Sequence, residues 1–375
     1  MRICKQCIQS DSRPQIYFSD DGICGACLWS NEKKTIDWNE RKNELHEIAN
    51  WAKQKSKDYD CAIGISGGKD STKQAIIARD TLGLKCLLVN DEPENISEVG
   101  KYNIENLKQL GFDVLSIRPN PQIMKKLMRK DFFDYLNPIK ITEYTLWSVT
   151  YVIANKFDIP LIIQGENGGL TLGISNSGLG KGPNALLANQ TSSVKDGLNE
   201  YLKVDGVSKK DLFWYTYDRN QLENKDIRGI WLNYYLEDWS NHGNAEFAKK
   251  YGLHFRPDDT DPNSIGTYVK YSQLDSNLVQ LNQMFKSIKL GFGQCSDHAN
   301  YDLRDGLIDR KKAIELVLNY DGKCSIEYIE DFCSYIEISI EEFWETVNKF
   351  RGPMWTKDDN GNWKNQYHDE LRKQL

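Results

Sequence analysis

Residues 60–72 constrain the fold of this 375-residue chain more than any other segment. They read DCAIGISGGKDST, in which an apolar run enters a turn of serine, two glycines and lysine, and helix-forming residues follow. The glycines let the backbone approach a ligand closely, and the first turn of a helix offers unpaired N–H groups at the positive end of its dipole. The segment therefore predicts a strand, a turn and a helix that together bind phosphate.

The side chains of this turn suit the same chemistry. Lys69 supplies a positive charge, the Ser66 hydroxyl can donate to a phosphate oxygen, and Asp70 can hold Mg²⁺ through water. We expect the nucleotide-binding residues of the turn to be Ser66, Gly67, Gly68, Lys69, Asp70 and Ser71. A glycine pair that only joins a strand to a helix is the alternative.

The spacing SGGKDS fits neither of the two common phosphate loops, because Walker A reads GxxxxGK[ST] and the dinucleotide fingerprint reads GxGxxG. It resembles instead the PP-loop of the ATP pyrophosphatase superfamily. Members of that superfamily bind the pyrophosphate of ATP and transfer AMP to a substrate oxygen. The resemblance implies that ATP, with Mg²⁺, is used by this chain.

Apolar runs alternate with helical stretches through the first half of the chain. After residues 60–65, further strands are expected at 85–91, 113–119 and 159–169, with helices at 97–110 and 141–156 between them. Continuous apolar strands separated by helices indicate a parallel sheet that is covered on both faces. We therefore predict an α/β fold with a doubly wound, mostly parallel sheet.

The ligand of such a sheet lies beyond the carboxyl ends of its strands. Glu166 and Asn167 are expected to face magnesium or the reacting amide, and the long loop 165–190 is expected to be a lid beside ATP. Ordinary turns or caps are the alternative for each residue past a strand. We expect further nucleotide contacts from Asn90, Asp91, Gly165 and Asn167, the first two facing the adenosine.

Four of the nine cysteines form two CxxC pairs, Cys4 with Cys7 and Cys24 with Cys27. Two such pairs can place four thiolates around one tetrahedral zinc ion. A four-thiolate site leaves no coordination position for a substrate, so we predict a structural zinc site rather than a catalytic one. An iron–sulfur cluster is the alternative.

Composition limits the remaining possibilities. The net charge of −6 argues against a broad nucleic-acid surface, and no apolar run approaches the roughly 18 residues of a membrane helix. No signal-peptide pattern precedes Cys4, so we expect a cytoplasmic protein. We expect a zinc module at 1–36, an ATP pyrophosphatase domain at 37–210, and a mainly helical sugar-binding or partner region at 211–375.

The segment 290–317 carries the densest polar cluster of the C-terminal half. The cluster includes Asp297 and His298, and Asp309 is expected to cap a helix that begins at LIDRKKAIEL. Composition alone favours a solvated, capped loop with internal ion pairs for this segment. Outside the two CxxC pairs, Cys295 is the cysteine that most needs explanation, because it lies in this cluster.

Motifs along nearly the whole chain resemble the N-acetyl sugar amidotransferases, which make acetamidino groups on bacterial surface sugars. They are CKQC, CGAC, ISGGKDS, IIQGEN, GTYVKYSQLD, LGFGQCSDHANYDLRDGLIDR and EEFWETVNKFRGP. Members act in making lipopolysaccharide O-antigen or flagellin glycans. The resemblance implies that ATP adenylates the oxygen of an acetamido group and that ammonia displaces AMP to give an amidine.

The same resemblance implies roles and partners. Lys69 and Asp70 would act on the pyrophosphate and magnesium, while Glu166, Asp297 and His298 are candidate bases for the proton that ammonia loses. The chain shows no convincing glutaminase pattern of its own. A separate glutaminase subunit is therefore expected to supply ammonia, together with a barrel synthase subunit in one version of the complex, and the substrate is an N-acetyl sugar.

Two other functions remain open from the sequence. A tRNA thiolase combines an SGGKDS loop with paired CxxC knuckles, but its chemistry needs sulfur and reactive cysteines, and the acidic composition counts against tRNA. A nucleotide-binding regulator built on a zinc scaffold explains the knuckles and leaves the intact loop without a chemical purpose.

Overall fold

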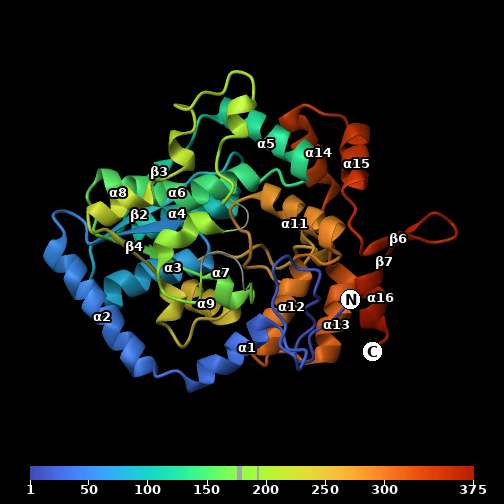
Figure 1. The fold of residues 1–375 in the computed structure, drawn as a ribbon, viewed down its shortest axis with the longest axis horizontal. Helices are drawn as coiled ribbons and strands as arrows, with labels where there is room; N and C mark the ends of the chain where they lie inside the picture. Colours follow the sequence, from blue (N-terminus) through green and yellow to red (C-terminus); the bar gives the residue numbers. More distant parts are fainter. Residues whose placement is uncertain (175–179, 192–193) are drawn as a thin grey trace.

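The computed structural model describes residues 1–174, 180–191 and 194–375, and it contains a five-stranded parallel sheet, which lies at the left in Figure 1. The strand order is β3-β2-β1-β4-β5. The strands are β1 (Cys61–Ile65), β2 (Cys86–Asp91), β3 (Asp113–Ile117), β4 (Leu161–Gln164) and β5 (Arg228–Trp231). From β1 the chain adds strands outward on one side and then returns to add β4 and β5 on the other. The predicted doubly wound parallel sheet is confirmed.

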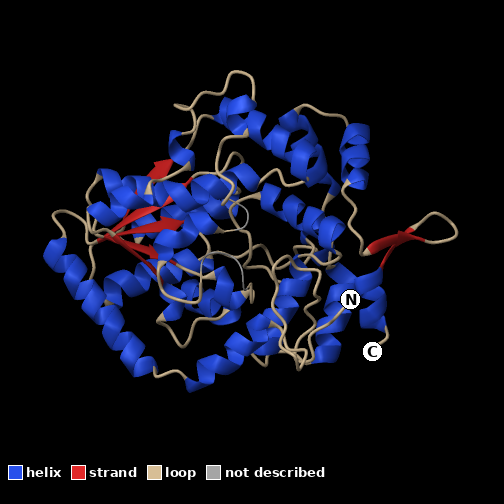
Figure 2. Ribbon diagram, in the orientation of Figure 1, coloured by secondary structure: helices blue, strands red, loops and turns tan. Residues whose placement is uncertain are grey.

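Helices cover both faces of this sheet (Figure 2). Ile63 packs into a core with α2 (Trp38–Lys55), α3 (Lys69–Ile76) and α4 (Glu98–Gln109), and its neighbour Ala62 packs into a second core with α6 (Lys140–Lys156). Successive strand residues point to opposite faces, and both faces are buried. This explains why the strands read as continuous apolar runs in the sequence.

The C-terminal part is mainly helical, as predicted, and has two further cores. An aromatic cluster of Phe132, Phe285, Phe332 and Phe343 joins α5 (Pro121–Tyr135), α11 (Asn277–Leu290), α14 (Ile326–Ile336) and α15 (Ile340–Lys349). The last core joins α12 (Gln294–Arg304), α13 (Arg310–Tyr320) and α16 (Gln366–Arg372) to the N-terminal segment through Ile8. The remaining elements are α1 (Gly25–Glu32), α7 (Gly168–Thr171), α8 (Arg219–Asn224), α9 (Asn241–Lys249), α10 (Pro262–Ile265) and the hairpin of β6 (Trp355–Lys357) and β7 (Trp363–Asn365).

Local signals account for the helix boundaries. Asp309 caps α13 by accepting from the Lys312 N–H at 2.7 Å, which confirms its predicted role. Asp37 caps α2 in the same way. Among the described residues, no helix combines the length and apolar character that crossing a membrane requires.

Two parts of the fold were not anticipated. The sheet gains its fifth strand, β5, from beyond residue 210, so the end of the sheet does not coincide with the predicted boundary there. The predicted lid loop, residues 165–190, includes 175–179, which lie outside the described residues. Its last part forms a short 3-10 helix, Ala185–Gln190, that packs against the sheet.

A buried carboxyl in the helical part gives a pH prediction. The Tyr201 hydroxyl lies 3.0 Å from both carboxyl oxygens of Asp131, which is fully buried, and burial raises the pKa of Asp131 to about 7. The folded pKa lies above the unfolded value, so the stabilisation is complete below about pH 4 and is lost as pH rises through 7. Asp131→Asn is expected to lack this loss and to exceed wild type by about 2–4 kcal/mol at pH 8.

Urea unfolding of both proteins between pH 4 and 8 checks this expectation. Asp134→Asn, on the same helix but partly exposed, serves as the matched control. Parallel stability curves for wild type and Asp131→Asn across this range would contradict it.

Candidate functional site

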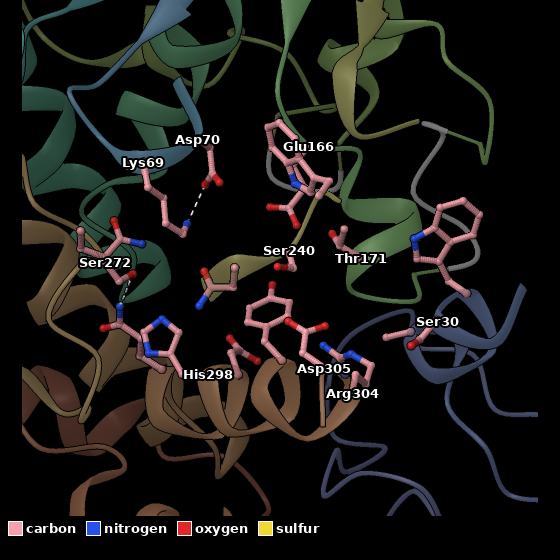
Figure 3. A pocket seen from close by; sticks show the side chains of 18 of the residues that line it. Ser30, Lys69, Asp70, Glu166, Thr171, Ser240, Ser272, His298, Arg304 and Asp305 are labelled. Carbon is pink, nitrogen blue, oxygen red and sulfur yellow. Dashed lines mark hydrogen bonds and ion pairs between the residues drawn. The ribbon is translucent and has the colours of Figure 1, made fainter. Parts of the chain in front are cut away.

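A polar cavity of about 250 Å³ lies at the carboxyl edge of the sheet (Figure 3). Its walls come from the start of α3, from the loop that follows β4, and from α1, α9, α11 and α12. Strands β1 and β4 adjoin at the point where the strand order reverses, which is where open α/β sheets bind ligands. The five residues proposed as catalytic from the sequence all line it: Lys69, Asp70, Glu166, Asp297 and His298.

The turn after β1 has the geometry of an anion cradle. Gly67 has a φ of +72°, and a Cβ there would lie 3.3 Å from the Gly100 carbonyl oxygen, so only glycine fits without strain. Gly68 is the N-cap of α3 and no side chain caps the helix. The first-turn N–H groups of α3 are thus left for a ligand, which fits a phosphate group.

Lys69 and Asp70 project from this turn toward the cavity (Figure 3). The Lys69 Nζ lies 2.7 Å from Asp70 Oδ2, and Asp70 Oδ1 accepts from Asn244 Nδ2 at 2.7 Å. The ammonium is largely buried and the carboxylate is partly exposed. The pair places one positive charge and one potential magnesium ligand beside the turn after β1, whose geometry fits a phosphate group.

Glu166 enters the cavity from the loop after β4. Burial raises the pKa of its carboxyl, and nearby Asp70 raises it further, while Lys69 and the Thr171 hydroxyl oppose the shift. A carboxylate with a raised pKa is a stronger base than an exposed one. Of the three candidate bases, Glu166 is the one whose environment strengthens it.

The residues on either side of Glu166, Gly165 and Asn167, make their contacts within the protein. Asn167 is fully buried, its Nδ2 donates to the Gly180 and Gly182 carbonyls, and its Oδ1 caps α7. A Cβ on Gly165 would meet Gln74 Nε2 at 2.5 Å. Neither residue lines the cavity. Their nucleotide contacts stay predictions, and what the structure shows is that they fix the backbone that carries Glu166.

Asn90 and Asp91 lie at the end of β2, outside the residues that line the cavity. Asn90 Nδ2 donates to Ser116 Oγ at 3.3 Å, and Asp91 Oδ2 accepts from Thr145 Oγ1 at 2.6 Å. Burial raises the pKa of Asp91 to about 8. Contact of these residues with adenosine stays a prediction. Ser71 donates its hydroxyl to the Gly68 carbonyl and so supports the turn from within.

The polar cluster of the C-terminal half lies on one face of α12. It is not the solvated loop that was considered from the sequence. Asp297, His298, Tyr301 and Arg304 recur at helical spacing along α12 and face the cavity together. Cys295 points elsewhere: it is fully buried, and its thiol donates to the Leu316 carbonyl at 3.4 Å. It belongs to a core and does not line the cavity.

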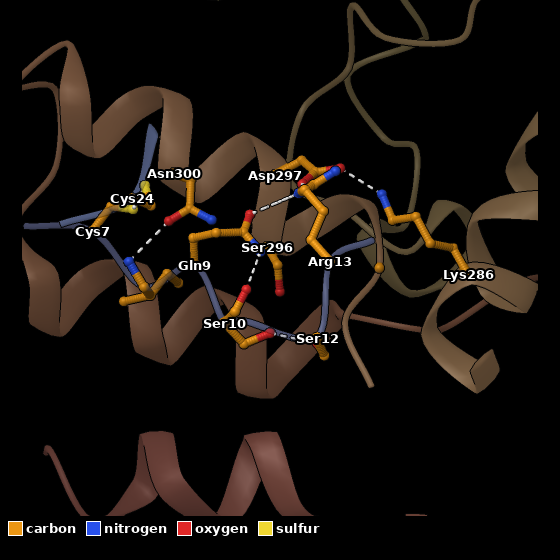
Figure 4. Close-up of polar contacts among 12 residues, drawn as sticks. Cys7, Gln9, Ser10, Ser12, Arg13, Cys24, Lys286, Ser296, Asp297 and Asn300 are labelled. Atoms are coloured by element: carbon orange, nitrogen blue, oxygen red, sulfur yellow. Dashed lines mark hydrogen bonds and ion pairs between the residues drawn. The ribbon is translucent and has the colours of Figure 1, made fainter. Parts of the chain in front are cut away.

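Asp297 is held between two cations (Figure 4). Arg13, from the N-terminal module, pairs with one carboxylate oxygen, and Lys286 Nζ lies 2.5 Å from the other. Burial acts to raise the pKa of Asp297, but the two cations outweigh it and lower the pKa to about 2. The carboxylate therefore stays ionised and is a weak base.

The four paired cysteines form one buried cluster in which all Sγ atoms lie within 4.8 Å of one another. Cys4 and Cys27 Sγ are 3.9 Å apart, and Cys7 and Cys24 Sγ are 3.6 Å apart. Zn–S bonds of about 2.3 Å give tetrahedron edges of about 3.8 Å. The cluster thus has room for one tetrahedral ion, and a multinuclear iron–sulfur cluster would need the thiols farther apart.

The cysteine module packs onto two walls of the cavity. Ile8 N–H donates to Asn300 Oδ1 on α12 at 2.9 Å, and Arg304 Nη1 lies 4.0 Å from Cys7 Sγ. Close backbone contact joins the module to α7, where a Cβ on Gly173 would lie 2.2 Å from Ala26 N. The module therefore contacts both α12 and the segment just after α7, which follows the Glu166 loop.

Several lining residues were missed by the sequence reasoning. They include Trp29, Ser30 and Lys33 near α1, Trp239 to Asn241 before and at the start of α9, and Gln283 on α11. No motif marks them, because each lies in an ordinary polar or amphipathic stretch. The helical spacing from Asp297 through Arg304 was a usable signal for Tyr301 and Arg304.

Comparison with known proteins adds a family for part of the chain. Residues 265–369 match the family described as LPS biosynthesis protein WbpG-like, C-terminal domain. No curated protein matches the chain. The match covers α11, α12 and the helices after them, and it confirms over these residues the resemblance to enzymes of bacterial surface sugars.

Solved structures show only remote likeness. A predicted subunit of tRNA methyltransferase from Methanocaldococcus jannaschii has 17% identity and a TM-score of 0.30, covering 54% of this chain and 82% of its own. NMN synthetase from Francisella tularensis has 17% identity and a TM-score of 0.29, covering 51% and 96%. NAD+ synthetase from Burkholderia pseudomallei has 13% identity and a TM-score of 0.27, covering 58% and 87%. With scores this low, the fold assignment rests on the strand order and the geometry of the turn after β1.

The helix that carries Asp297 and His298 therefore lies within a segment, residues 265–369, that is similar to the WbpG-like C-terminal domain of lipopolysaccharide biosynthesis proteins.

Proposed function

We propose that the protein is an ATP-dependent amidotransferase of glycan biosynthesis, which converts an acetamido group of an N-acetyl sugar into an acetamidino group. The observation that carries the proposal is the convergence of the turn after β1, the Glu166 loop and α12 on one cavity. A turn suited to phosphate thereby faces a wall that is similar to a lipopolysaccharide biosynthesis family. Candidate acceptors are a UDP-diacetamido uronic acid and a nonulosonic acid.

The proposed reaction has two steps. The acetamido oxygen attacks the α-phosphorus of ATP, the α–β phosphoanhydride bond breaks, and pyrophosphate leaves. Ammonia then attacks the imidate carbon and loses a proton, and the C–O bond to AMP breaks. Lys69 and the first-turn N–H groups of α3 would bind the pyrophosphate, where negative charge builds. Mg²⁺ would add charge stabilisation beside Asp70.

Other parts of the proposal concern partners and the metal. Ammonia would come from a separate glutaminase subunit, with or without a barrel synthase subunit, and the complex would act in the cytoplasm on O-antigen or flagellin sugars. We assign zinc to the four cysteines in a structural role, because four thiolates close its coordination shell.

Release of AMP and pyrophosphate tests the function. Protein is mixed with ATP, ammonia and UDP-linked acetamido sugars, and in parallel with tRNA. AMP that depends on the sugar supports the proposal. AMP that responds only to tRNA would favour a thiolase, although none of the described residues that line the cavity is a cysteine. Nucleotide binding without AMP release from any acceptor would favour a regulator.

Glu166→Gln tests the base. Because Glu166 must be deprotonated to accept a proton from ammonia, the wild-type rate is expected to rise with pH through a pKa above the ordinary glutamate value. The variant should lose about 100- to 1,000-fold in amidine formation and should lose that pH dependence. The rate is measured at constant free ammonia, so that ammonia's own titration does not enter.

The exposed Glu105→Gln on α4 is the matched control and should keep the wild-type profile. A Glu166→Gln variant with the wild-type pH profile would exclude Glu166 as the base.

A further inference from the structure

His298 makes a hydrogen bond behind the cavity wall that constrains its protonation. Its Nδ1 lies 2.7 Å from Thr267 Oγ1, and Thr267 is fully buried in the loop after α10. The ring is nearly buried as well, and it lines the cavity. Because Nδ1 is hydrogen-bonded behind the cavity wall, Nε2 is the ring nitrogen of His298 that can contact a ligand in the cavity.

The partners of Thr267 decide which nitrogen carries the proton. A threonine hydroxyl has one hydrogen to donate and two lone pairs to accept with. Val269 N–H already donates to Thr267 Oγ1 at 3.2 Å. Among the described residues, His298 Nδ1 is the only acceptor within reach of the Thr267 hydrogen. If Nδ1 carried a proton, the buried hydroxyl hydrogen would have no acceptor, which native structures avoid.

Full satisfaction of this network therefore requires that Thr267 donates to a bare Nδ1. A neutral imidazole with a bare Nδ1 carries its proton on Nε2. Burial lowers the pKa of His298 to about 3, so the ring is neutral at physiological pH. His298 then presents an N–H donor to the cavity and has no lone pair there to act as a base.

The opposite wall of the cavity indicates which kind of ligand atom the His298 N–H would contact. Lys69 and the phosphate cradle face His298 across the cavity in Figure 3, and the positive charge of Lys69 reaches the ring, where it helps to lower the pKa of His298. A neutral N–H donor opposite a lysine suits an anionic phosphoryl oxygen.

We propose that His298 is a neutral hydrogen-bond donor to a phosphoryl oxygen of the bound adenylate, and that Thr267 is the positioning residue that fixes its Nε2–H tautomer. The proposal rests on the proposed function for the identity of the adenylate. It removes His298 from the candidate bases and leaves that role to Glu166.

Nitrogen NMR of histidine-labelled protein tests the tautomer without any turnover. The chain has five histidines, and the His298→Gln spectrum identifies the signals of His298 by their loss. We expect the Nε2–H tautomer from pH 5 to 8, and we expect saturating AMP to shift the Nε2–H signal. An Nδ1–H tautomer or a charged ring at pH 7 would overturn the assignment, and an Nε2–H signal unmoved by AMP would overturn the phosphoryl contact.

Kinetics separate a donor from a base. His298→Ala should lower kcat by about 100-fold. In His298→Gln, the side-chain amide can supply an N–H at the place of Nε2, so kcat should stay within about tenfold of wild type. Equal losses in both variants would indicate a base and contradict the proposal. His46→Gln on α2, away from the cavity, is the matched control and should leave kcat unchanged.

Thr267→Val and Thr267→Ser test the positioning role. The valine variant keeps the shape but removes the hydroxyl, so both tautomers should appear and kcat should fall about tenfold. The serine variant should restore both the single tautomer and the rate. A valine variant that loses activity while keeping the pure Nε2–H tautomer would show that Thr267 acts only on stability, which thermal melts report independently. Sugar-dependent AMP release in wild type tests the proposed function separately, because the NMR result needs no acceptor.

Discussion

Replacing Lys69 with alanine is expected to lower AMP formation by about 100- to 1,000-fold while the protein stays folded. The Lys69 ammonium is the cavity cation that stands in the phosphate turn itself, paired with Asp70 at 2.7 Å. Its interaction grows as charge moves onto the departing pyrophosphate, so the loss should fall mainly on kcat and less on the KM for ATP. Pyrophosphate release at saturating acceptor measures the effect.

Lys101→Ala is the matched control for this experiment. Lys101 is exposed on α4 and pairs with Glu98 three residues before it, as a surface lysine commonly does. It should keep the wild-type rate, since such pairs contribute little to stability and none to the cavity. A Lys69→Ala protein that forms AMP at the wild-type rate would remove the turn after β1 from the chemistry.

The sequence predicted best where the signal is local. The turn at residues 66–71 is specified by adjacent residues, because two glycines and an uncapped helix start need no distant partner to form an anion cradle. The paired cysteines are similar, since their spacing already brings four thiols together. Strand β5 was missed because it has four residues and its first, Arg228, is exposed, so no periodic pattern distinguishes it.

The sequence predicted least where a role depends on distant neighbours. Asp297 and Glu166 are equally acceptable bases by residue type, but only the fold brings Arg13, 284 positions before Asp297, against its carboxylate. That contact lowers one pKa, while burial beside Asp70 raises the other. The same holds for His298, whose tautomer follows from a hydroxyl 31 positions away.

Residues just past strands show a second limit. Position in a parallel sheet brings Glu166 and Asn167 to the same edge, and it cannot say which of them turns outward. Asn167 satisfies its polar atoms within the protein, so it shapes the loop, and Glu166 is left to face the cavity. The contacts within the protein, and not the position at the edge of the sheet, determine which of these two residues faces the cavity.

Loss of the zinc ion that we propose for the four cysteines is expected to abolish activity while the sheet remains folded. The fully buried core of the cysteine module is the four thiols and Ala26, and Ile16, Phe18 and Ile23 pack against it only partly buried, so apolar burial alone contributes little to holding the module together. Bound zinc stabilises comparable small sites by about 10–16 kcal/mol. Without it, the module should release both the Glu166 loop and α12, whose spacing defines the cavity.

Cys7→Ser tests this expectation without a chelator. The variant should lose its single equivalent of metal, become sensitive to proteolysis within residues 1–36, and form no detectable AMP. Circular dichroism should still report a folded sheet, because the core around Ile63 makes no use of the module. Cys324→Ser, at a half-buried cysteine outside the cluster, should retain metal and activity. Full activity of metal-free Cys7→Ser would contradict this expectation, because the metal would then have no part in holding the cavity walls. The contacts of Arg13 and Ile8 with α12 would have to form without the metal.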